Sequence, residues 1–402
     1  MAYDMGRMVL KGLLTRTQFD ADAIDRVIMG CVIQDVDTSN VARESALGAG
    51  IPQHVPAFTV TMACISSNQA VTSGVDLIRG GGADAVVAGG TETLSDPPIR
   101  LQRSVRKRLF ESRKAKSPRD YLELVQGLSP SDLVPESPSI AEFSTGEVMG
   151  ESADKLAAMF GVTREEQDEY ALLSHERAAQ AQEDGRLDKE LHPATVPPSF
   201  APIEHDNVVR PDTSLEKLSS LSPAFVKPFG TVTAGNSSAL TDGASATLLM
   251  SAEAARAEGY TPTAALRHYT YVAQDPGREL LLGPAYAIPK LLDEAGLTLG
   301  DIDVIELHEA FAGQVLAVLE ALRSPSFAEE NLNRSSPVGD VDLDRMNARG
   351  GSLSLGHPFG ATGARLVTTA AHRLHEEDGD LALVSACAAG GQGHALLLER
   401  WS

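Results

Sequence analysis

Cys64 lies between an apolar run and small polar residues, in the stretch TMACISSNQAV at 61–71. The run ending at Val60 predicts a strand and Ser66 opens a predicted helix, which places Cys64 in the turn at the helix start. Free backbone N–H groups and the positive end of the helix dipole favour a thiolate there. Cys64 is therefore a candidate nucleophile, although free cysteines more often pack in a protein core.

A histidine able to activate a thiol lies in GGSLSLGHPFGATGARL at 350–366, where His357 stands between Gly356 and Pro358. Imidazole titrates near neutral pH and can remove a thiol proton. A structural role is the alternative for any of the ten histidines in the chain. The glycines on both sides of His357 give the backbone room at the start of a predicted helix, and they favour a functional role.

Two further candidate groups follow predicted strands. Cys387 ends a strand in SACAAGGQGHA at 385–395, and the small residues after it let backbone N–H groups approach a ligand, as an oxyanion site requires. His308 follows another strand in IELHEAFAGQV. Because that segment lacks the H-E-x-x-H pattern and offers no further ligands at a set spacing, it predicts no metal site.

The amino-acid composition excludes several classes of protein. The 402 residues are 43% hydrophobic, enough for a core and for two or three domains. A formal net charge of -21 repels phosphate backbones, so no nucleic-acid binding is expected. Three widely spaced cysteines indicate neither a disulfide framework nor a zinc site and predict a reducing compartment. The first residues, MAYDMGRMVLKGLL, predict a folded helix rather than a secretion signal.

Predicted helices and strands alternate in residues 1–93 and 241–261, which we assign to an N-terminal domain, and again in a C-terminal domain at 262–402. Such alternation is typical of buried, largely parallel sheets with helices on both faces. Residues 94–240 are rich in Pro, Ser and charge and form a predicted inserted domain. AIDRVIMG in the first unit resembles DIDVIELH in the second, which indicates a duplicated α/β fold.

Eight segments spread over essentially the whole chain together resemble the thiolase family: NVARESALGAG, TMACISSNQA, EFSTGEVMGESADKLA, PAFVKPFGTVTAGNSS, LLLGPAYA, HEAF, GGSLSLGHPFGATG and CAAGGQGHA. The resemblance implies an α/β thiolase fold, with duplicated α/β/α units forming a five-layered α-β-α-β-α core and an inserted loop domain. His308 stands where most thiolases carry Asn in an N-E-A-F motif. With His at this position the chain resembles the 3-ketoacyl-CoA thiolase β subunits of trifunctional fatty-acid oxidation complexes.

The resemblance implies an acetyl-CoA C-acyltransferase of β-oxidation, which cleaves 3-ketoacyl-CoA with CoA into acetyl-CoA and a shortened acyl-CoA. Cys64 would be the acylated nucleophile, His357 its base, and Cys387 the acid and base for the leaving and attacking groups. The backbone N–H groups of Cys64 and Ala389 would hold the first oxyanion, although thiolases commonly have Gly at the position of Ala389. His308 and His357 would hold the enolate. No metal or redox cofactor is implied.

The inserted domain would bind CoA. The resemblance places Met149 near the pantetheine, Arg210 near the nucleotide and Ser238 along the CoA arm, while an ordinary surface arginine is the alternative for Arg210. It also implies a homodimer that joins a hydratase/3-hydroxyacyl-CoA dehydrogenase α chain. We expect a bacterial-type cytoplasmic location with possible membrane association.

One segment is strongly basic in an acidic chain. Residues 100–119 carry nine basic side chains and one acidic, with Leu101, Val105, Leu109 and Phe110 spaced to form an apolar side. A membrane-surface helix, a docking site for a partner, a funnel for anionic acyl-CoA and a plain solvated helix all remain open. Because related β subunits carry an insertion here and work in membrane-associated complexes, partner or membrane contact is favoured.

Two rival functions and one departure from the family remain. A decarboxylating ketoacyl synthase has a similar sequence around its nucleophilic cysteine. Such synthases use two histidines and no second catalytic cysteine, so Cys387 argues against this function. A non-catalytic thiolase-fold scaffold that binds acyl-CoA or lipid is opposed by the intact Cys64, His308, His357 and Cys387. Thiolases usually open with a strand before the helix that begins here near Met5, and its absence predicts that the numbered chain lacks its beginning.

Overall fold

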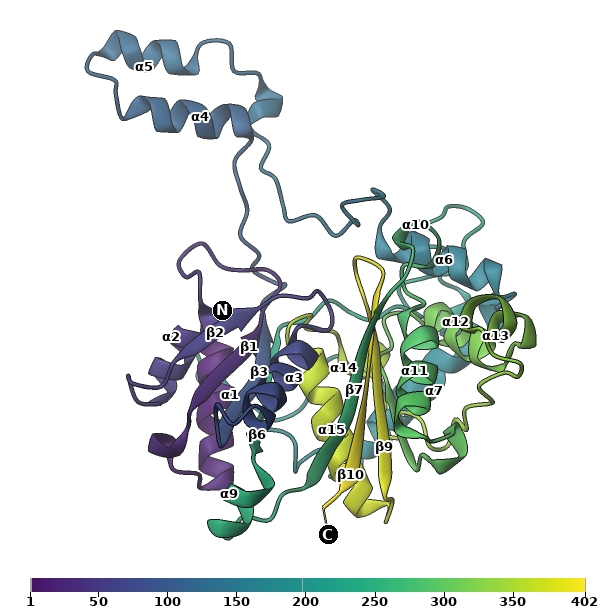
Figure 1. Cartoon of the computed structure of the whole chain (residues 1–402). Coiled ribbons are helices and arrows are strands. Elements are labelled where there is room, and N and C mark those ends of the chain that lie inside the picture. Colours follow the sequence, from purple (N-terminus) through teal and green to yellow (C-terminus); the bar gives the residue numbers. More distant parts are fainter. Residues whose placement is uncertain (1, 197, 402) are drawn as a thin grey trace.

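The computed structural model describes residues 2–196 and 198–401, which contain two four-stranded sheets (Figure 1). The first sheet has the order β2 (Ala57–Val60), β1 (Arg26–Gly30), β3 (Ala85–Glu92), β6 (Gly243–Met250). The second has the order β7 (Ala264–Ala273), β10 (Gln392–Arg400), β9 (Leu381–Ala388), β8 (Val304–Leu307). Every residue of β3 is buried, as expected for an apolar strand in the middle of a covered sheet.

The two sheets differ in strand direction. β1, β2 and β3 run parallel and β6 antiparallel, whereas in the second sheet only β8 and β9 are parallel. The expectation of largely parallel sheets is therefore wrong for the second unit. The reason is the short turn between β9 and β10, in which Gly390 and Gly391 have φ of 87° and 66°, because so short a connection can join only antiparallel strands.

Helices separate and cover the sheets in five layers (Figure 1). The outer face of the first sheet packs on α1 (Ala2–Thr17) and α2 (Val41–Ala49). Between the sheets lie α3 (Ser66–Arg79) and α15 (Thr362–Glu376). The outer face of the second sheet packs on α11 (Gly283–Ala295), with α12 (Ala312–Arg323) beside it. This is the layered α/β arrangement that the sequence predicts; its domain boundaries stay predictions.

The inserted segment divides into a packed part and a projecting arm. In the packed part α6 (Met149–Met159) and α7 (Arg164–Glu183) lie against α12. The arm is the antiparallel pair α4 (Arg103–Ser112) and α5 (Pro118–Val125), which stands away from the body on two extended connections (Figure 1). The predicted basic helix is thus two helices. The remaining strands and α-helices are β4 (Ala194–Thr195), β5 (Pro202–Ile203), α8 (Leu215–Ser219), α9 (Ala252–Ala257), α10 (Pro276–Glu279), α13 (Pro325–Leu332) and α14 (Ser352–Leu355).

No described helix has both the length and the apolar character needed to cross a bilayer.

Candidate active site

Cys64 lies in a sharp turn between β2 and α3. Ala63 adopts a φ of 46°, a conformation that residues with a side chain rarely take. The hydroxyl of Ser66 ties the turn together, because it accepts the backbone N–H of Met62 at 2.8 Å and donates to the carbonyl of Ala63 at 2.7 Å. The turn thus holds the half-buried Cys64 thiol at the start of α3.

Two histidines from the C-terminal unit meet this thiol. His308 follows β8, and His357 lies between α14 and α15. The thiol sulfur and one ring nitrogen from each histidine all lie within 4.8 Å of one another. The two ring centroids are 4.2 Å apart at an angle of 46°. Both rings are buried, and among the described residues neither Nε2 atom has a hydrogen-bond partner.

Cys387 and Ala389 complete the cluster from the end of β9. The Cys387 thiol is buried, and its pKa is raised first by burial and then by the charge of Cys64, so the two sulfurs lie within electrostatic reach. The backbone N–H groups of Ala389 and of Cys64 itself both act to lower the pKa of the Cys64 thiol. The structure therefore brings together the four side chains and both backbone donors singled out in the sequence.

The electrostatics of the site differ from the sequence expectation. Burial raises the pKa of Cys64 to about 11, and it outweighs the backbone N–H groups that lower it. The expectation that the helix start favours a resting thiolate is therefore wrong. Burial, with a smaller effect from the Arg365 charge, lowers the pKa of His357 to about 3. Burial and the neighbouring His357 hold the pKa of His308 well below its usual range. Thiol and imidazoles are all neutral at rest.

Glu92 is a buried carboxylate that the sequence reading missed. It lies at the end of β3 and accepts the backbone N–H groups of Val32 and Ile33 at 3.0 and 2.9 Å. It also accepts the N–H of Gly360 at 2.9 Å, from the loop that carries His357. Glu92 thus fixes the position of the second unit's loop on the first unit. No local pattern signals this, since the partners are far apart in sequence.

A second missed carboxylate, Glu309, supports the histidine segment. It accepts hydrogen bonds from the Tyr170 and Ser174 hydroxyls at 2.8 Å each and from the Asn347 amide at 2.7 Å. The backbone N–H of Leu353 also donates to it, at 3.2 Å. The HEAF motif places this glutamate beside His308, and that adjacency was the available signal. Glu309 joins α7 of the inserted segment to the site.

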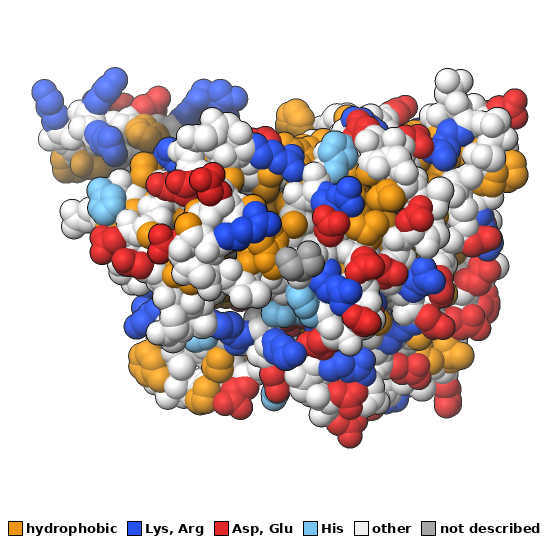
Figure 2. Space-filling model, turned by 60° about the horizontal axis from the view of Figure 1, so that its bottom comes forward, with side chains coloured by type: hydrophobic (Ala, Val, Ile, Leu, Met, Phe, Trp, Pro, Cys, Tyr) orange, Lys and Arg blue, Asp and Glu red, His pale blue; other side chains and the backbone are white. Residues whose placement is uncertain are grey.

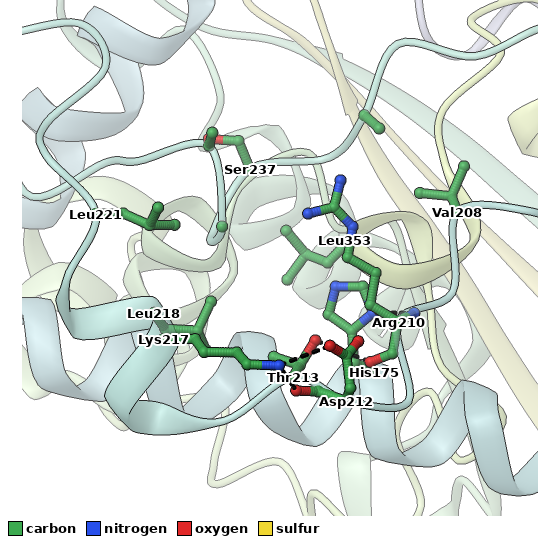
Figure 3. A pocket seen from close by; sticks show the side chains of 13 residues that line it. His175, Val208, Arg210, Asp212, Thr213, Lys217, Leu218, Leu221, Ser237 and Leu353 are labelled. Atoms are coloured by element: carbon green, nitrogen blue, oxygen red, sulfur yellow. Dashed lines mark hydrogen bonds and ion pairs between the residues drawn. The ribbon is translucent and has the colours of Figure 1, made fainter.

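The three residues expected to contact CoA lie in different surroundings. Arg210 is exposed and lines a cavity of about 190 Å³, whose walls also include the exposed Lys217 and the buried His175 (Figure 3). Ser238 is half-buried beside the site, where its N–H donates to the Ala310 carbonyl at 3.0 Å.

The neighbours of Ser238 connect this cavity to the histidines. Ser237 and Ala239 both line the cavity, and the carbonyl of Ala239 accepts the N–H of His357 at 2.9 Å. Met149 begins α6 and packs on the C-terminal core, and it is not among the residues that line the cavity.

Comparisons with known proteins cover the whole chain. The thiolase N-terminal domain model matches residues 1–253 and the thiolase C-terminal domain model matches residues 260–400. A Mus musculus mitochondrial trifunctional enzyme subunit beta is 55% identical over 401 residues, 100% of this chain and 84% of the relative. A probable 3-ketoacyl-CoA thiolase of Caenorhabditis elegans is 53% identical over 407 residues, 100% of this chain and 89% of the relative.

Solved structures agree with the sequence relatives. The human mitochondrial 3-ketoacyl-CoA thiolase superposes with a TM-score of 0.85 at 32% identity, covering 100% of this chain and 93% of that one. The predicted thiolase fold is confirmed. The expected bacterial-type cytoplasmic location is wrong, because the relatives that are 55% identical are mitochondrial proteins. With both family models matched and relatives aligned over the whole of this chain, the chain belongs to the thiolase family.

Proposed function

We propose that this chain is a 3-ketoacyl-CoA thiolase, an acetyl-CoA C-acyltransferase that shortens a 3-ketoacyl-CoA by two carbons in fatty-acid β-oxidation. The observation that carries the proposal is the cluster of one thiol sulfur and two imidazole nitrogens within 4.8 Å at Cys64, His308 and His357. A neutral thiol beside a neutral imidazole suits a nucleophile that is deprotonated only when a substrate carbonyl arrives. The β-subunit names of several relatives agree with this activity.

The first half-reaction forms an acyl-enzyme. Nε2 of His357 takes the thiol proton as the Cys64 sulfur attacks the 3-keto carbon, and the N–H groups of Cys64 and Ala389 hold the oxyanion. As the oxyanion collapses, the C2–C3 bond breaks and its electron pair passes into the enolate of acetyl-CoA. His308 and the protonated His357 hold the enolate oxygen, and Cys387 gives its proton to C2. Acetyl-CoA then leaves.

The second half-reaction transfers the acyl group to CoA. The Cys387 thiolate left by the first half-reaction takes the proton of the incoming CoA thiol. The CoA sulfur attacks the thioester carbon, and the Cys64 sulfur leaves and regains its proton from His357. Both cysteines and the histidine return to their starting forms. Because protein groups and CoA supply every bond and proton, we expect no metal or redox cofactor.

CoA has a path from the protein surface to this cluster. The cavity at Arg210 and Lys217 offers positive charge for the phosphates, and its wall includes Ser237 and Ala239 (Figure 3). That wall leads to the His357 backbone and to Ser238, which can hydrogen-bond the pantetheine arm. Lys217 is held in place by Asp212 at 2.6 Å. We assign the phosphate end of CoA to this cavity. Met149 does not line the cavity, and we place it on the other side of the pantetheine.

The names of the relatives bear on how the protein assembles with other subunits. The relatives named as trifunctional enzyme β subunits support association with an α chain carrying hydratase and 3-hydroxyacyl-CoA dehydrogenase activities, and we propose a homodimer as the core of that complex.

The α4–α5 arm, defined as residues 100–126, exposes the apolar side chains of Leu109, Phe110 and Leu122. Figure 2 shows apolar and basic side chains next to one another at the upper left, where the arm lies. That mixture suits the surface of an anionic membrane, where we place the arm.

Not every basic residue of the arm is available for such contact. The Arg108 guanidinium donates to the carbonyls of Leu124 and Gln126 at 2.8 Å each, so it holds α4 against the end of α5. Arg106 lies 3.7 Å from the Glu136 carboxylate. Lys107, by contrast, is exposed. Tests of membrane contact should therefore change exposed lysines and leave Arg106 and Arg108 intact.

A thiolysis assay tests the proposed activity. Purified protein is mixed with acetoacetyl-CoA or a longer 3-ketoacyl-CoA and CoA, and loss of the Mg-enolate absorbance is followed together with formation of acetyl-CoA. Turnover that needs CoA supports the thiolase. Release of CO2 from malonyl-CoA would instead indicate a ketoacyl synthase. Binding of acyl-CoA without turnover would indicate a scaffold.

A further inference from the structure

We propose that Ser352, itself held by Arg365, is a positioning residue that keeps the ring proton of His308 on Nε2, so that His308 always presents a hydrogen-bond donor to the acylation site. The proposal deepens the function proposed above and rests on it, since His308 is there assigned to hold the enolate oxygen. A neutral imidazole can donate from only one nitrogen. The tautomer therefore decides whether His308 can do this.

The contacts fix a direction for the hydrogen bonds. The Arg365 guanidinium lies 3.2 Å from the Ser352 hydroxyl and can only donate. The same hydroxyl lies 3.0 Å from Nδ1 of His308. Within the described part of the chain, that nitrogen is the one acceptor in reach of the hydroxyl proton. The chain of donation therefore runs from Arg365 to Ser352 to Nδ1 of His308, and the ring proton lies on Nε2.

The reverse arrangement would leave a buried hydroxyl proton unpaired. If His308 carried its proton on Nδ1, the Ser352 hydroxyl would accept from both sides and its own proton would find no described acceptor. Ser352 is fully buried, and proteins rarely leave buried polar hydrogens without a partner. In the proposed arrangement the hydrogen without a described partner is the one on Nε2 of His308, which the enolate oxygen would accept during the reaction. Another nitrogen of the Arg365 guanidinium lies 3.8 Å from the buried side chain of Glu306, close enough for electrostatic attraction but not for a hydrogen bond. The whole network thus favours one tautomer of His308.

The neighbouring ring is held in the opposite way. Nδ1 of His357 lies 2.6 Å from the Thr362 hydroxyl, which donates to the carbonyl of Pro358 at 3.1 Å. The hydroxyl then accepts from Nδ1–H, and Nε2 of His357 keeps its lone pair for the Cys64 thiol. Two rings only 4.2 Å apart therefore differ in role, one a donor and one a base, because different hydroxyls hold them.

A double-mutant cycle with His308→Asn tests this assignment by kcat/KM for thiolysis. An amide group has N–H donors whatever its neighbours are, so it does not depend on a tautomer. We expect Ser352→Ala to lower kcat/KM about tenfold in the otherwise native enzyme, as loss of partners behind a functional histidine does elsewhere. In the His308→Asn background the same change should have little effect. Ser352→Thr, which keeps the hydroxyl, should restore activity.

Ser354 provides the matched control. It lies two residues away on the same short helix, and its hydroxyl contacts Ser174 and Gly351 rather than either catalytic histidine. Ser354→Ala should have the same effect in both backgrounds. An equal loss from Ser352→Ala in both backgrounds, or none in the native one, would show that Ser352 does not act through His308.

The tautomer is also measurable without turnover. In protein labelled with 15N-histidine, the His308 signals are identified by their loss in His308→Asn, and their couplings report which nitrogen carries the proton. We expect the proton on Nε2 in the native enzyme and a larger population on Nδ1 after Ser352→Ala. A native proton on Nδ1 overturns the proposal. An inactive enzyme with the proton on Nε2 would instead refute the thiolase activity and leave the tautomer assignment standing.

Discussion

The backbone N–H of Gly360 donates to the carboxylate of Glu92 at 2.9 Å, across 268 positions of the sequence. This hydrogen bond joins the end of a strand in the N-terminal unit to the loop that presents His357. The charge of Glu92 also acts on the site, because it raises the pKa of the Cys64 thiol, after burial and against the backbone N–H groups. One carboxylate thus holds the loop of the base and adds a small effect to the burial that keeps the nucleophile protonated.

Replacement of the nucleophile should remove the acyl-enzyme. Because the Cys64 sulfur is the one within 4.8 Å of both histidine nitrogens and the Cys387 thiol is assigned to proton transfer, Cys64→Ala should lower kcat by roughly 10⁶-fold, as loss of a covalent nucleophile does elsewhere. Mass spectrometry after incubation with 3-ketoacyl-CoA should detect the added acyl group on native protein and not on Cys64→Ala. Cys31→Ala is the matched control, since that thiol is also in the first unit but contacts Glu92 rather than the cluster, and it should still acylate. Acylated Cys64→Ala protein would contradict the assignment.

Loss of the second cysteine should separate the two half-reactions. Cys387→Ala retains nucleophile and base, so an activated acyl thioester should still acylate Cys64. Thiolysis should fall about 10²- to 10⁴-fold, the usual contribution of a general acid and base. Single-turnover acylation and steady-state thiolysis measured on one preparation distinguish these effects. Unchanged thiolysis would remove Cys387 from the mechanism.

The raised pKa of Cys64 predicts slow alkylation of the resting enzyme. Below a pKa of about 11 the thiolate fraction rises tenfold per pH unit, so the rate with iodoacetamide should keep rising between about pH 7 and pH 10. A free cysteine derivative, whose pKa is about 8.5, should level off within that range and serves as the control. Cys64 modification is followed by peptide mass spectrometry. A plateau for Cys64 below pH 8 would mean that the helix start outweighs burial after all.

Removal of metal should leave thiolysis intact, whereas added zinc should inhibit it. Cys64, His308 and His357 offer one sulfur and two nitrogens within 4.8 Å, a ligand set that zinc accepts. Zinc bound there would occupy the nucleophile, and a chelator should reverse the inhibition. Products are measured by chromatography, because the Mg-enolate absorbance itself depends on a metal. Activity that disappears on chelation and returns with metal would refute a metal-free mechanism.

Exposed lysines of the α4–α5 arm should carry membrane binding. Each lysine near an anionic bilayer contributes about 1 kcal/mol, so changing Lys107, Lys114 and Lys116 to Gln should weaken vesicle binding roughly 100-fold. Vesicles with and without phosphatidylserine, and activity on a soluble substrate, are measured in parallel. Activity should not change.

The control for the arm is a variant with the same loss of charge elsewhere, in which Lys11, Lys189 and Lys290 become Gln. These three side chains are also exposed. Equal weakening in both variants would indicate net charge rather than the arm. Normal vesicle binding with lost co-purification of an α chain would place the arm at a protein contact instead.

The sequence predicted those parts of the site that have a local signature. Cys64 stands at a strand-to-helix turn and His357 in a glycine-rich loop, and both features can be read within ten residues. Glu92, Ser352 and Arg365 act through partners that only the folded chain brings near, so their positions carry no local signal. The raised pKa of Cys64 has no local signal either, because its largest cause is burial, which depends on the folded chain.

Some features of the fold also have a sequence signature and others do not. The alternation of helices and strands predicted two layered units, and the repeat of AIDRVIMG as DIDVIELH correctly marked β1 and β8 as equivalents. Strand direction in the second sheet was missed, because periodicity reports burial and not orientation. The paired glycines after Cys387 were visible, and the short turn that they form was the evidence for an antiparallel pair.

β10 is the last described strand of the chain, yet it lies in the interior of its sheet, between β7 and β9. The second sheet therefore cannot be completed before the β10 segment has been made, whereas domains generally fold as they emerge, first residues first. A nascent chain that already carries Cys64 in its turn still lacks the base, the second sulfur and the Ala389 donor. Acyl transfer thus has to wait for the β9 segment, which brings Cys387 and Ala389 to a nucleophile made more than 300 residues earlier.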